Sequence, residues 1–586
     1  MSVHAPVAAL RVANEAFLVS STIERCPKTM MIRELVVNAI EAAATATADK
    51  VVDITSATID GAPKLCVRNT GRGMSAAELD RICDLASSLY KENSLDANFG
   101  MGAKVASLPS NKHGLRYRSC KDGIASEVIM CQRDGVYGRL RRGEAADGSP
   151  IEVIDVTAAC RAEGCDLSQD WTEVVLFGQS PAQNTVVDPY AGNPRMAPDW
   201  LLDTLLLRFF RTPPAVTLRL SPGITGGGAP CTLRTLDDLV RLAAQSEVVE
   251  TPSGIRIHYR YDPEAQDGGR PAIGHGHPGA IGCIVYKNEI YDPRTGSRWV
   301  LDAPTYGIPF GAKFCSVFVE LPDDYLVRPE AYRQFLRFRG GDQRQVFLRD
   351  FGQLVMTYLP GWLKAVIRSH GPQQQQFIGE VEDELRTLLM ELEIAPEFKP
   401  APGAVPPKPA EAKAPAEKPA GETKPATPPA PPPPPKKNFE RPPEIISLDD
   451  EALIEERGLN GRAGKFYPTS HQLFVNLQYP AVQAVAAQLE VEFDSALNHE
   501  RMRSVARSVA GWAVTRRVAR ALVYSLSKKA AGWPAEDVKR AQSPETFSLV
   551  ADDWSSVIES ARLRMQEDLG TDWQAAKAEP DLAAAA

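Results

Sequence analysis

The chain has 586 residues, a formal net charge of −8 and 44% hydrophobic residues, a composition typical of a soluble protein with several hydrophobic cores. The excess of acidic residues argues against a chain that is basic overall for coating nucleic acid. No apolar run is long enough for a transmembrane helix, and the N-terminus lacks a signal-peptide pattern. The ten cysteines include no C-x-x-C pair, which predicts reduced thiols and a cytoplasmic protein.

The first part of the chain predicts two helices followed by a sheet. Apolar residues at three- and four-residue spacing indicate helices over 10–22 and 29–46. This order favours an α+β sandwich over a repeating βαβ fold. The expected strands are 51–59, 64–67, 115–119, 125–131 and 173–177, and a further helix is expected over 199–210.

A second mixed region begins near the strand expected at 215–221. Its long helices are expected over 345–370, interrupted at Pro360, and over 373–392. Its other expected strands are 254–261, 280–286 and 313–321.

A proline-rich segment follows these helices. Residues 396–443 contain 18 of the 47 prolines, mixed with alanine, lysine and glutamate. Such a segment predicts disorder with extended polyproline II character, and it serves as a tether or as a docking motif for a proline-binding partner. Beyond it, residues 447–569 predict a separate, mostly helical unit with one strand at 473–477.

Three short segments carry the residues that suggest chemistry. Glu34, Asn38 and Glu41 are spaced i, i+4 and i+7, so they share one helix face, where they could hold a hydrated metal ion and orient water. The glycines of Asn69-Thr70-Gly71-Arg72-Gly73-Met74 follow a strand and permit close backbone approach to a flat ligand. Asn98-Phe99-Gly100-Met101-Gly102-Ala103-Lys104 precedes a helix and suggests a phosphate cradle.

Taken together, these segments resemble the ATPase superfamily of DNA gyrase B subunits, the ninety-kilodalton heat-shock chaperone, histidine kinases and MutL, called GHKL. The E-x-x-x-N-A box is matched from Glu34 to Ala39, the D-x-G-x-G box from Asn69 to Gly73, and the lid box from Gly100 to Lys104. Thr172 matches the threonine on a late strand. The four elements occur in the family's order over about 140 residues.

The resemblance implies a role for each matched residue. Glu34 would be the general base that activates water, and Asn38 would bind Mg²⁺. The base of ATP would lie among Asn69, Gly71, Gly73, Met74 and Thr172. Gly100, Gly102, Ala103 and Lys104 would close over the phosphates as part of a lid that starts near Lys91, with Lys104 neutralising charge during catalysis, and Glu41 completes the cofactor-binding set.

One residue departs from the family pattern. Position 69 is asparagine where the family has aspartate. A neutral amide is a weaker hydrogen-bond acceptor than a carboxylate, so weaker ATP binding is expected.

The layout is nearest to MutL- or MORC-like proteins. Residues 1–222 would form the GHKL (Bergerat) α/β sandwich and 223–344 a transducer-like domain, followed by long helices over 345–395, the linker, a C-terminal interaction domain over 444–570 and a tail over 571–586. The basic residue that reaches the γ-phosphate would be Lys287, Lys313 or one of Arg333, Arg337, Arg339 and Arg344.

The resemblance implies an ATP- and Mg²⁺-dependent clamp that dimerises on ATP and acts on DNA. The alternatives are a chaperone-like ATPase with a protein client and a nucleotide-binding scaffold without hydrolysis. Eight Lys or Arg residues between 501 and 529 leave a DNA face open, although they do not form one helical stripe. Two other patterns, His275-Gly276-His277 and Gly461-Arg462-Ala463-Gly464-Lys465-Phe466, predict no zinc site and a simple turn.

Overall fold

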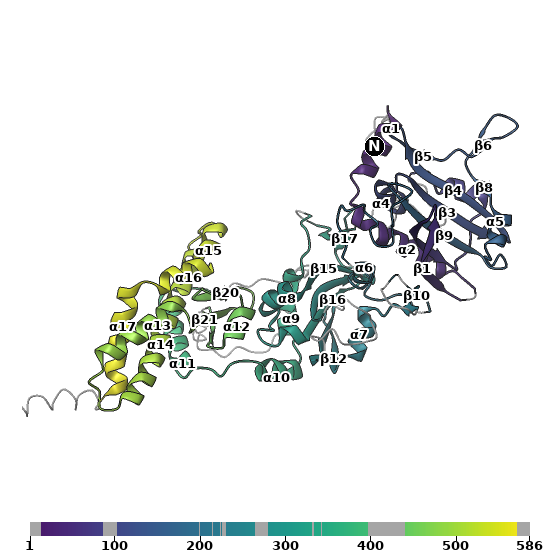
Figure 1. Cartoon of the computed structure of the whole chain (residues 1–586). Helices are drawn as coiled ribbons and strands as arrows, with labels where there is room; N and C mark the ends of the chain where they lie inside the picture. The colour runs from purple at the N-terminus through teal and green to yellow at the C-terminus, as the bar shows by residue number, and fades with distance from the viewer. Residues whose placement is uncertain are drawn as a thin grey trace, which may run out of the picture. The chain divides into compact units, whose positions relative to one another are not determined.

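A computed structural model describes most of the chain as two compact units. The described residues are 13–47, 49–85, 102–197, 200–213, 215–222, 224, 230–263, 279–330, 333–340, 343–395 and 440–570. The first unit comprises Met1–Thr295 and Lys313–Leu348, and the second comprises Gly296–Ala312 and Arg349–Ala586 (Figure 1).

The first unit is built on a mixed sheet with nine strands among the described residues. Its pairs are antiparallel except for β1 with β10, which confirms the expected α+β sandwich. The order is β11 (Cys231–Thr232), β10 (Thr217–Leu220), β1 (Val51–Ile59), β2 (Ala62–Asn69), β9 (Trp171–Gly178), β3 (Gly114–Lys121), β4 (Ile124–Arg133) and β5 (Val136–Arg139), with β8 (Ile154–Asp155) on β4.

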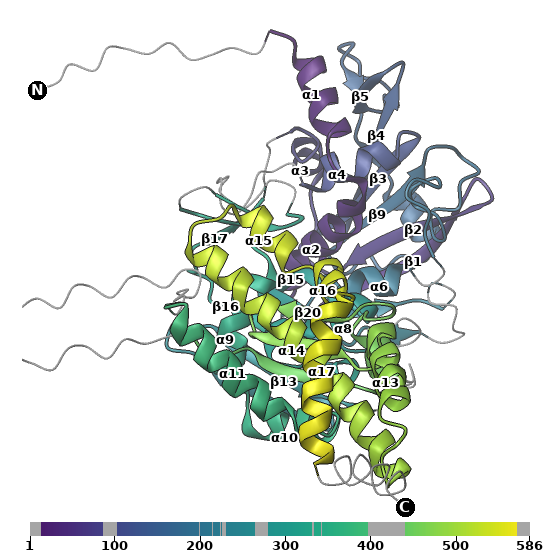
Figure 2. The same ribbon diagram turned by 90° about the vertical axis from the view of Figure 1, so that its left-hand side faces the viewer.

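Helices cover one face of this sheet. Both views place α1 (Glu15–Glu24), α2 (Met31–Ala43) and α4 (Gly102–Ser107) on the same side (Figures 1 and 2). Alternate side chains of the strands and one side of α2 form the core, among them Val52, Leu65, Leu115, Val174, Leu35 and Val36. The opposite face carries cross-strand ion pairs, such as Arg116 with Glu173 at 2.9 Å and Arg118 with Glu127 at 2.7 Å, and a small apolar cluster beneath α5 (Thr157–Ala162).

The two N-terminal helices differ from their predicted bounds for local reasons. Asn14 caps α1 by accepting a hydrogen bond from the Phe17 amide, so the helix begins at 15 rather than 10. Residues 28–30 form a 3-10 turn, so α2 begins at 31 rather than 29.

A second, five-stranded sheet lies in the same unit. Its order is β12 (Gln245–Glu250), β13 (Arg256–Tyr261), β16 (Cys315–Leu321), β14 (Ile281–Tyr286) and β15 (Glu289–Thr295). The three strands with long apolar runs were predicted. β12 was missed because it is an exposed, polar edge strand, and β15 because Asp292, Pro293 and Arg294 interrupt its pattern.

The second unit begins with shorter helices than predicted. The predicted helix over 345–370 is instead a 3-10 turn followed by α9 (Gly352–Thr357) and α10 (Gly361–Ser369), which are separated around Pro360. The predicted helix over 373–392 is observed as α11 (Ile378–Glu391). A segment from the earlier part of the chain, α8 (Gly296–Asp302), also belongs to this unit.

The C-terminal region contains a small sheet that the sequence reading missed. β21 (Gln472–Asn476) was expected, but β19 (Glu444–Leu448) and β20 (Gly464–Tyr467) flank it. The turn predicted at 461–466 is therefore wrong in its last three residues, which lie in β20. The helices are α12 (Glu451–Glu456), α13 (Pro480–Glu492), α14 (His499–Ala530), α15 (Ala535–Ala541), α16 (Pro544–Ala551) and α17 (Trp554–Leu569).

The helix before the proline-rich segment packs with the helices after it. Glu384 of α11 pairs with Arg516 and Arg520 of α14, each at 2.6 Å, and their apolar faces share one core. The Glu440 amide donates to the Ile394 carbonyl at 2.8 Å, so the two described ends of the segment meet. Residues 396–439 themselves lie outside the described residues. The C-terminal region is therefore not the separate unit predicted from the sequence, because α11 completes its core.

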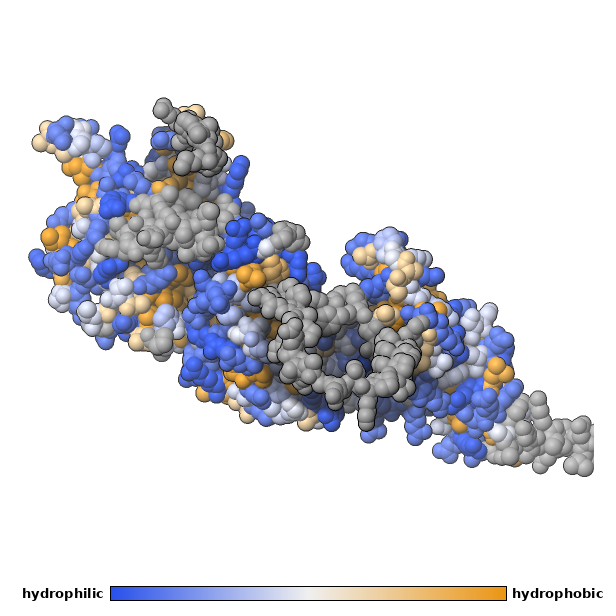
Figure 3. Space-filling view, turned by 180° about the vertical axis from the view of Figure 1, so that it is seen from behind, coloured by the Kyte–Doolittle hydropathy of each residue, from blue (hydrophilic) through white to orange (hydrophobic). Residues whose placement is uncertain are grey.

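The surface is mainly hydrophilic. Figure 3 shows hydrophobic residues scattered in small groups on the face in view. Within the described ranges, no helix has both the length and the apolar character required to cross a membrane. All ten cysteines are described, and all are free thiols.

Candidate functional site

Three neighbouring strands end in polar residues on the face that carries the helices. Along β2, Leu65 and Val67 are followed on the same face by Asn69. The same alternation places Thr172, near the start of the antiparallel β9, and Ser119, near the end of β3, on this face. Asn69 pairs with Thr172 across the β2–β9 ladder, and Thr172 pairs with Ser119 across β9–β3. The apolar core therefore gives way to a row of one amide and two hydroxyls at one end of the sheet.

Hydrogen bonds fix the orientation of this polar row. The Gly71 amide donates to the Asn69 side-chain oxygen at 3.0 Å, and the Asn69 side-chain nitrogen donates to the Thr172 carbonyl at 3.4 Å. The Ser119 and Thr172 hydroxyls lie 2.8 Å apart, and the Met74 amide donates to the Ser119 hydroxyl at 2.8 Å. Asn69 is 5% exposed. Its buried amide cannot flip without placing a donor against the Gly71 donor.

The glycines of the second segment are required by close backbone contacts. A Cβ atom at Gly71 would lie 2.4 Å from the carbonyl carbon and oxygen of Ala42 in α2. A Cβ atom at Gly73 would lie 1.7 Å from the Cys120 carbonyl oxygen. The segment is therefore pressed between the end of α2 and strand β3, which brings two of the predicted boxes into contact.

The first and third boxes also meet. A Cβ atom at Gly102 would lie 2.0 Å from Oε2 of Glu34. Glu34 projects from α2 with its side chain 14% exposed, and Ala103 is buried at the start of α4. The absence of a side chain at 102 thus leaves the space that the Glu34 carboxylate occupies. Gly100 and Lys91 lie outside the described residues.

Asn38 and Glu41 lie on the exposed side of α2, opposite the buried residues Leu35, Val36 and Ala39. Glu34, Asn38 and Glu41 therefore face away from the core as the helical spacing predicts. A carboxylate, an amide and a second carboxylate are oxygen donors of the kind that Mg²⁺ prefers. These residues fit a magnesium-bound nucleotide, and the polar row with its glycine segment fits a flat polar base.

Lys104 occupies a different position from the one its motif suggests. Its ammonium group donates to the carbonyl oxygens of Ile82, at 2.6 Å, and Asp84. The side chain is 7% exposed, and burial lowers the pKa of Lys104 to about 8. In this arrangement Lys104 holds the end of α3 (Ala76–Arg81), and its role toward phosphate stays a prediction.

A buried ion-pair network beside Glu34 was not predicted. Arg33, 3% exposed, donates to Glu34 through Nη1 at 2.5 Å and to Glu289 of β15 through Nε at 3.0 Å and through Nη2. Arg208 reaches the same Glu289 carboxylate at 2.5 Å. The one available signal in the sequence is a charged residue at position 33, where the helical pattern requires an apolar one.

The residues proposed to reach the γ-phosphate are dispersed. Lys287 lies exposed at the β14–β15 turn, and Lys313 is exposed at the start of β16. Arg333 approaches Glu289 at 3.9 Å, which places it nearest to the α2 network. Arg337, Arg339 and Arg344 contact Gln343, Val327 and the Phe338 ring respectively.

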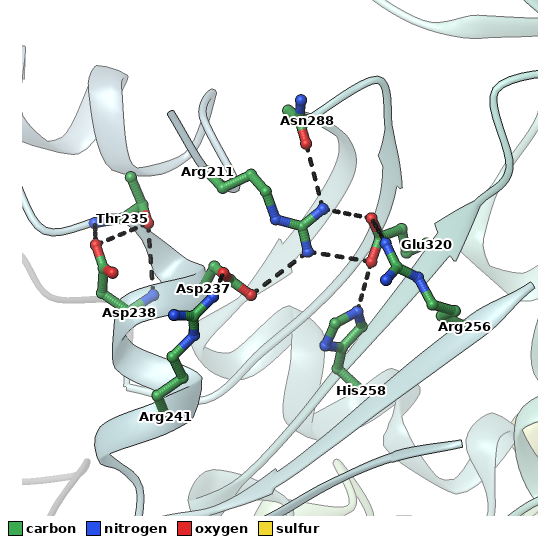
Figure 4. A network of polar contacts seen from close by, with 9 residues as sticks. All are labelled: Arg211, Thr235, Asp237, Asp238, Arg241, Arg256, His258, Asn288 and Glu320. Atoms are coloured by element: carbon green, nitrogen blue, oxygen red, sulfur yellow. Dashed lines mark hydrogen bonds and ion pairs between the residues drawn. The ribbon is translucent and has the colours of Figure 1, made fainter. Parts of the chain in front are cut away.

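A second polar network lies between α7 (Leu236–Leu242) and the second sheet, beside a cavity of about 530 Å³ (Figure 4). Arg211 bridges Asp237 and Glu320, and His258 Nε2 lies 2.7 Å from Glu320. Burial alone would raise the pKa of Glu320, but its bonds to His258 and Arg211 hold it well below the ordinary value. Because its positive and negative groups pair with one another, the network joins α7 to the second sheet. It leaves neither Asp237 nor Glu320 as an unpaired carboxylate for catalysis.

No group of three histidine, cysteine or carboxylate side chains suited to a metal occurs in the part of the chain that the structure describes. His275 and His277 fall outside that part. Mg²⁺ usually keeps few protein ligands and bridges to the phosphates of a bound nucleotide, and the oxygen donors of α2 fit that arrangement.

The comparison with protein families agrees with this geometry. Residues 28–133 match the family described as histidine kinase-, DNA gyrase B- and HSP90-like ATPase. The match includes Glu34, Asn69 and Gly102, whereas Thr172 lies beyond it. No curated protein matches the chain. The N-terminal part of the chain is therefore a GHKL-type ATPase domain, a type that binds ATP.

Proposed function

We propose that this protein hydrolyses ATP with Mg²⁺ and uses the nucleotide to gate a conformational clamp. The observation that carries the proposal is the convergence of four sequence segments. Glu34 meets Gly102, the loop with Gly71 packs on α2, and Asn69 pairs with Thr172 across the sheet.

Each residue has a role that its position supports. Glu34 activates water, because it is the carboxylate beside the lid-box glycine and faces away from the core. Asn38 holds Mg²⁺, and Glu41 lies one turn further along the same exposed face. Asn69, Met74 and Thr172 surround the base. Mg²⁺ neutralises charge on the phosphates, while the chain positions the nucleotide and the attacking water.

The second sheet of the same unit supports the proposed clamp. The β14–β15 hairpin contacts α2 through Glu289 and Arg33, so the nucleotide-binding layer and the second sheet share a buried ion-pair network. We propose a MutL- or MORC-like cycle in which ATP orders the lid, two protomers associate, and hydrolysis releases them.

The client of the clamp is DNA or a protein. Of the eight basic residues between 501 and 529, Arg516 and Arg520 pair with Glu384, and Arg517 pairs with Asp553. These three guanidinium groups serve the packing of α11, α14 and α17, so fewer charges of α14 are available to nucleic acid than its sequence suggests. This observation favours a protein client for the second unit, with DNA as the alternative.

A nucleotide-binding scaffold without hydrolysis is the remaining candidate. It is favoured by Asn69, whose amide oxygen already accepts the Gly71 amide and is neutral where the family has a charged acceptor. The intact Glu34 beside Gly102 favours hydrolysis.

Calorimetric titration with Mg²⁺ and ATP tests the site directly. We expect the wild-type protein to bind one ATP per chain and Gly71→Ala to bind weakly, because the added Cβ would lie 2.4 Å from the Ala42 carbonyl and displace the segment proposed to contact the base. Gly138→Ala is the control, since a Cβ there meets nothing within 4 Å. Equal binding by all three proteins would place the nucleotide elsewhere. Repeating the titration with duplex DNA present distinguishes a DNA client from a protein client.

A further inference from the structure

One guanidinium group is shared by two carboxylates from distant parts of the sequence. Arg33 lies in α2 beside Glu34, and 256 positions separate it from Glu289. The Nε and Nη2 edge of Arg33 faces Glu289, whereas only Nη1 reaches Glu34. The forked edge of an arginine is its strongest contact for a carboxylate. Glu289 is therefore the stronger partner of the Arg33 guanidinium group.

Glu289 is fixed in place by its own backbone and by a second arginine. It stands at the start of β15, directly after the tight turn at Lys287 and Asn288, both of which have positive φ. An isolated bridge joins it to Phe209, and the Ile290 amide donates to the Arg208 carbonyl at 2.8 Å. The Arg208 guanidinium also bonds Oε2 of Glu289, the oxygen that accepts Nε of Arg33. The hairpin tip thus presents a rigidly held anion to α2.

The network is buried, so its charges act strongly on one another. Arg33 is 3% exposed, and the Glu289 side chain is 11% exposed. Burial alone would raise the pKa of Glu289, but Arg208 and Arg33 hold it below its ordinary value. Burial would likewise lower the pKa of Arg33, while Glu289 and Glu34 raise it. Both groups are therefore fully charged at neutral pH.

The way Arg33 divides its N–H groups between Glu289 and Glu34 determines how the Glu34 carboxylate is oriented. A carboxylate that serves as general base must point an oxygen at the attacking water, and an arginine that binds both of its oxygens through the forked edge would turn it away. While Glu289 occupies the forked edge of Arg33, Glu34 meets a single N–H group through Oε1, and its Oε2 lies toward Gly102. Without Glu289, the forked edge of Arg33 would be available to bind both oxygens of Glu34.

We propose that Glu289 is a positioning residue for ATP hydrolysis: it holds Arg33 so that a single N–H group of Arg33 engages Glu34, and Oε2 of Glu34 keeps its place beside Gly102. The inference rests on the proposed ATPase function and adds a contribution from the second sheet to the nucleotide site. A displacement of the β14–β15 hairpin would change the contact between Arg33 and Glu34. The conformation of the second sheet would therefore affect the proposed site of hydrolysis directly.

The test compares Glu289→Gln with the wild type and with Glu173→Gln. Glu173 is a matched control, because it is a largely buried carboxylate paired with Arg116 on the opposite face of the first sheet. For Glu289→Gln we expect kcat to fall about tenfold, while KM and the calorimetric Kd for Mg·ATP stay within about twofold. A variant that only disturbed the structure would change KM and Kd together with kcat.

A double substitution shows whether Glu289 acts through Arg33. On an Arg33→Gln background, Glu289→Gln should produce no further fall in kcat. Unfolding of the nucleotide-free variants provides a readout that does not depend on turnover, and the two substitutions should be non-additive. If Glu289→Gln fails to fold, Glu289→Asp keeps the charge and should give a smaller loss of kcat.

The possible failures are distinguishable. Wild-type protein that neither binds nor hydrolyses ATP would overturn the proposed function and this inference with it. Wild-type turnover with Glu289→Gln indistinguishable from Glu173→Gln would overturn the inference alone. Additive effects of Arg33→Gln and Glu289→Gln on kcat would also overturn it.

Discussion

Replacing Asn69 by aspartate should convert the base-binding end of the sheet to the family's pattern. In the wild type, the amide oxygen of Asn69 accepts the Gly71 amide and its nitrogen donates to the Thr172 carbonyl, so the adenine amino group would have to share that neutral oxygen beside the nitrogen. That nitrogen is a donor, and the exocyclic amino group of adenine is also a donor. A carboxylate would keep the Gly71 bond with one oxygen and offer the other to adenine as an acceptor.

The expected gain is moderate. A hydrogen bond to a charged acceptor contributes about 1.5–3 kcal/mol, against about 0.5–1.5 kcal/mol for a neutral one. The difference of about 1–1.5 kcal/mol corresponds to roughly five- to tenfold tighter ATP binding. Asn69 is 5% exposed, so desolvation of the new carboxylate subtracts from this gain, and the Gly71 amide offsets part of that cost.

Calorimetry with ATP and with ITP measures both consequences. ITP presents an oxygen where adenine has its amino group, so Asn69→Asp should bind ATP more tightly and ITP more weakly than the wild type does. Asn184→Asp is the control, because its side-chain oxygen also accepts backbone amides but belongs to a loop away from the polar row. Unchanged relative affinities for ATP and ITP in Asn69→Asp would refute the placement of the base beside residue 69.

Two further predictions concern stability. Gly73→Ala should lower the free energy of unfolding by about 3 kcal/mol, since its Cβ would lie 1.7 Å from the Cys120 carbonyl oxygen, whereas Gly143→Ala should be neutral; urea unfolding of both variants checks this. Because the pKa of Glu320 is lower in the folded protein than its ordinary value of 4.5, its contribution to stability is present at neutral pH and disappears as the pH falls through the folded-state pKa. Glu320→Gln should therefore have a lower urea midpoint than the wild type at pH 7, and the difference between the two midpoints should shrink below about pH 4. A difference that stays constant from pH 7 to below pH 4 would contradict the stabilising role of the ionised Glu320.

The helix and turn positions of the first two boxes could be predicted because each depends on local spacing. Glu34 and Asn38 fall on one face through helical periodicity, and Gly71 and Gly73 follow a strand directly. Ser119 was missed, although the alternation along β3 places it on the same face as apolar residues, because a serine in a strand is unremarkable without its neighbours in the sheet.

The long-range parts of the structure could not be predicted from spacing. The contact between Arg33 and Glu289 depends on how the second sheet packs against α2, and one sequence contains no signal for that register. Spacing also could not predict that the apolar face of α11 packs against α14, which lies beyond the proline-rich segment. Composition identified that segment, but only the packing of its flanks shows that the helices on both sides belong to one core.

The most direct test of the central claim is steady-state ATP turnover with Mg²⁺ by the wild type and by Glu34→Ala. The account predicts measurable phosphate release by the wild type, loss of release in Glu34→Ala, and ATP binding retained by both proteins. Equal turnover by the two proteins would contradict the role of Glu34. Binding without turnover in the wild type would contradict hydrolysis and leave a nucleotide-binding scaffold.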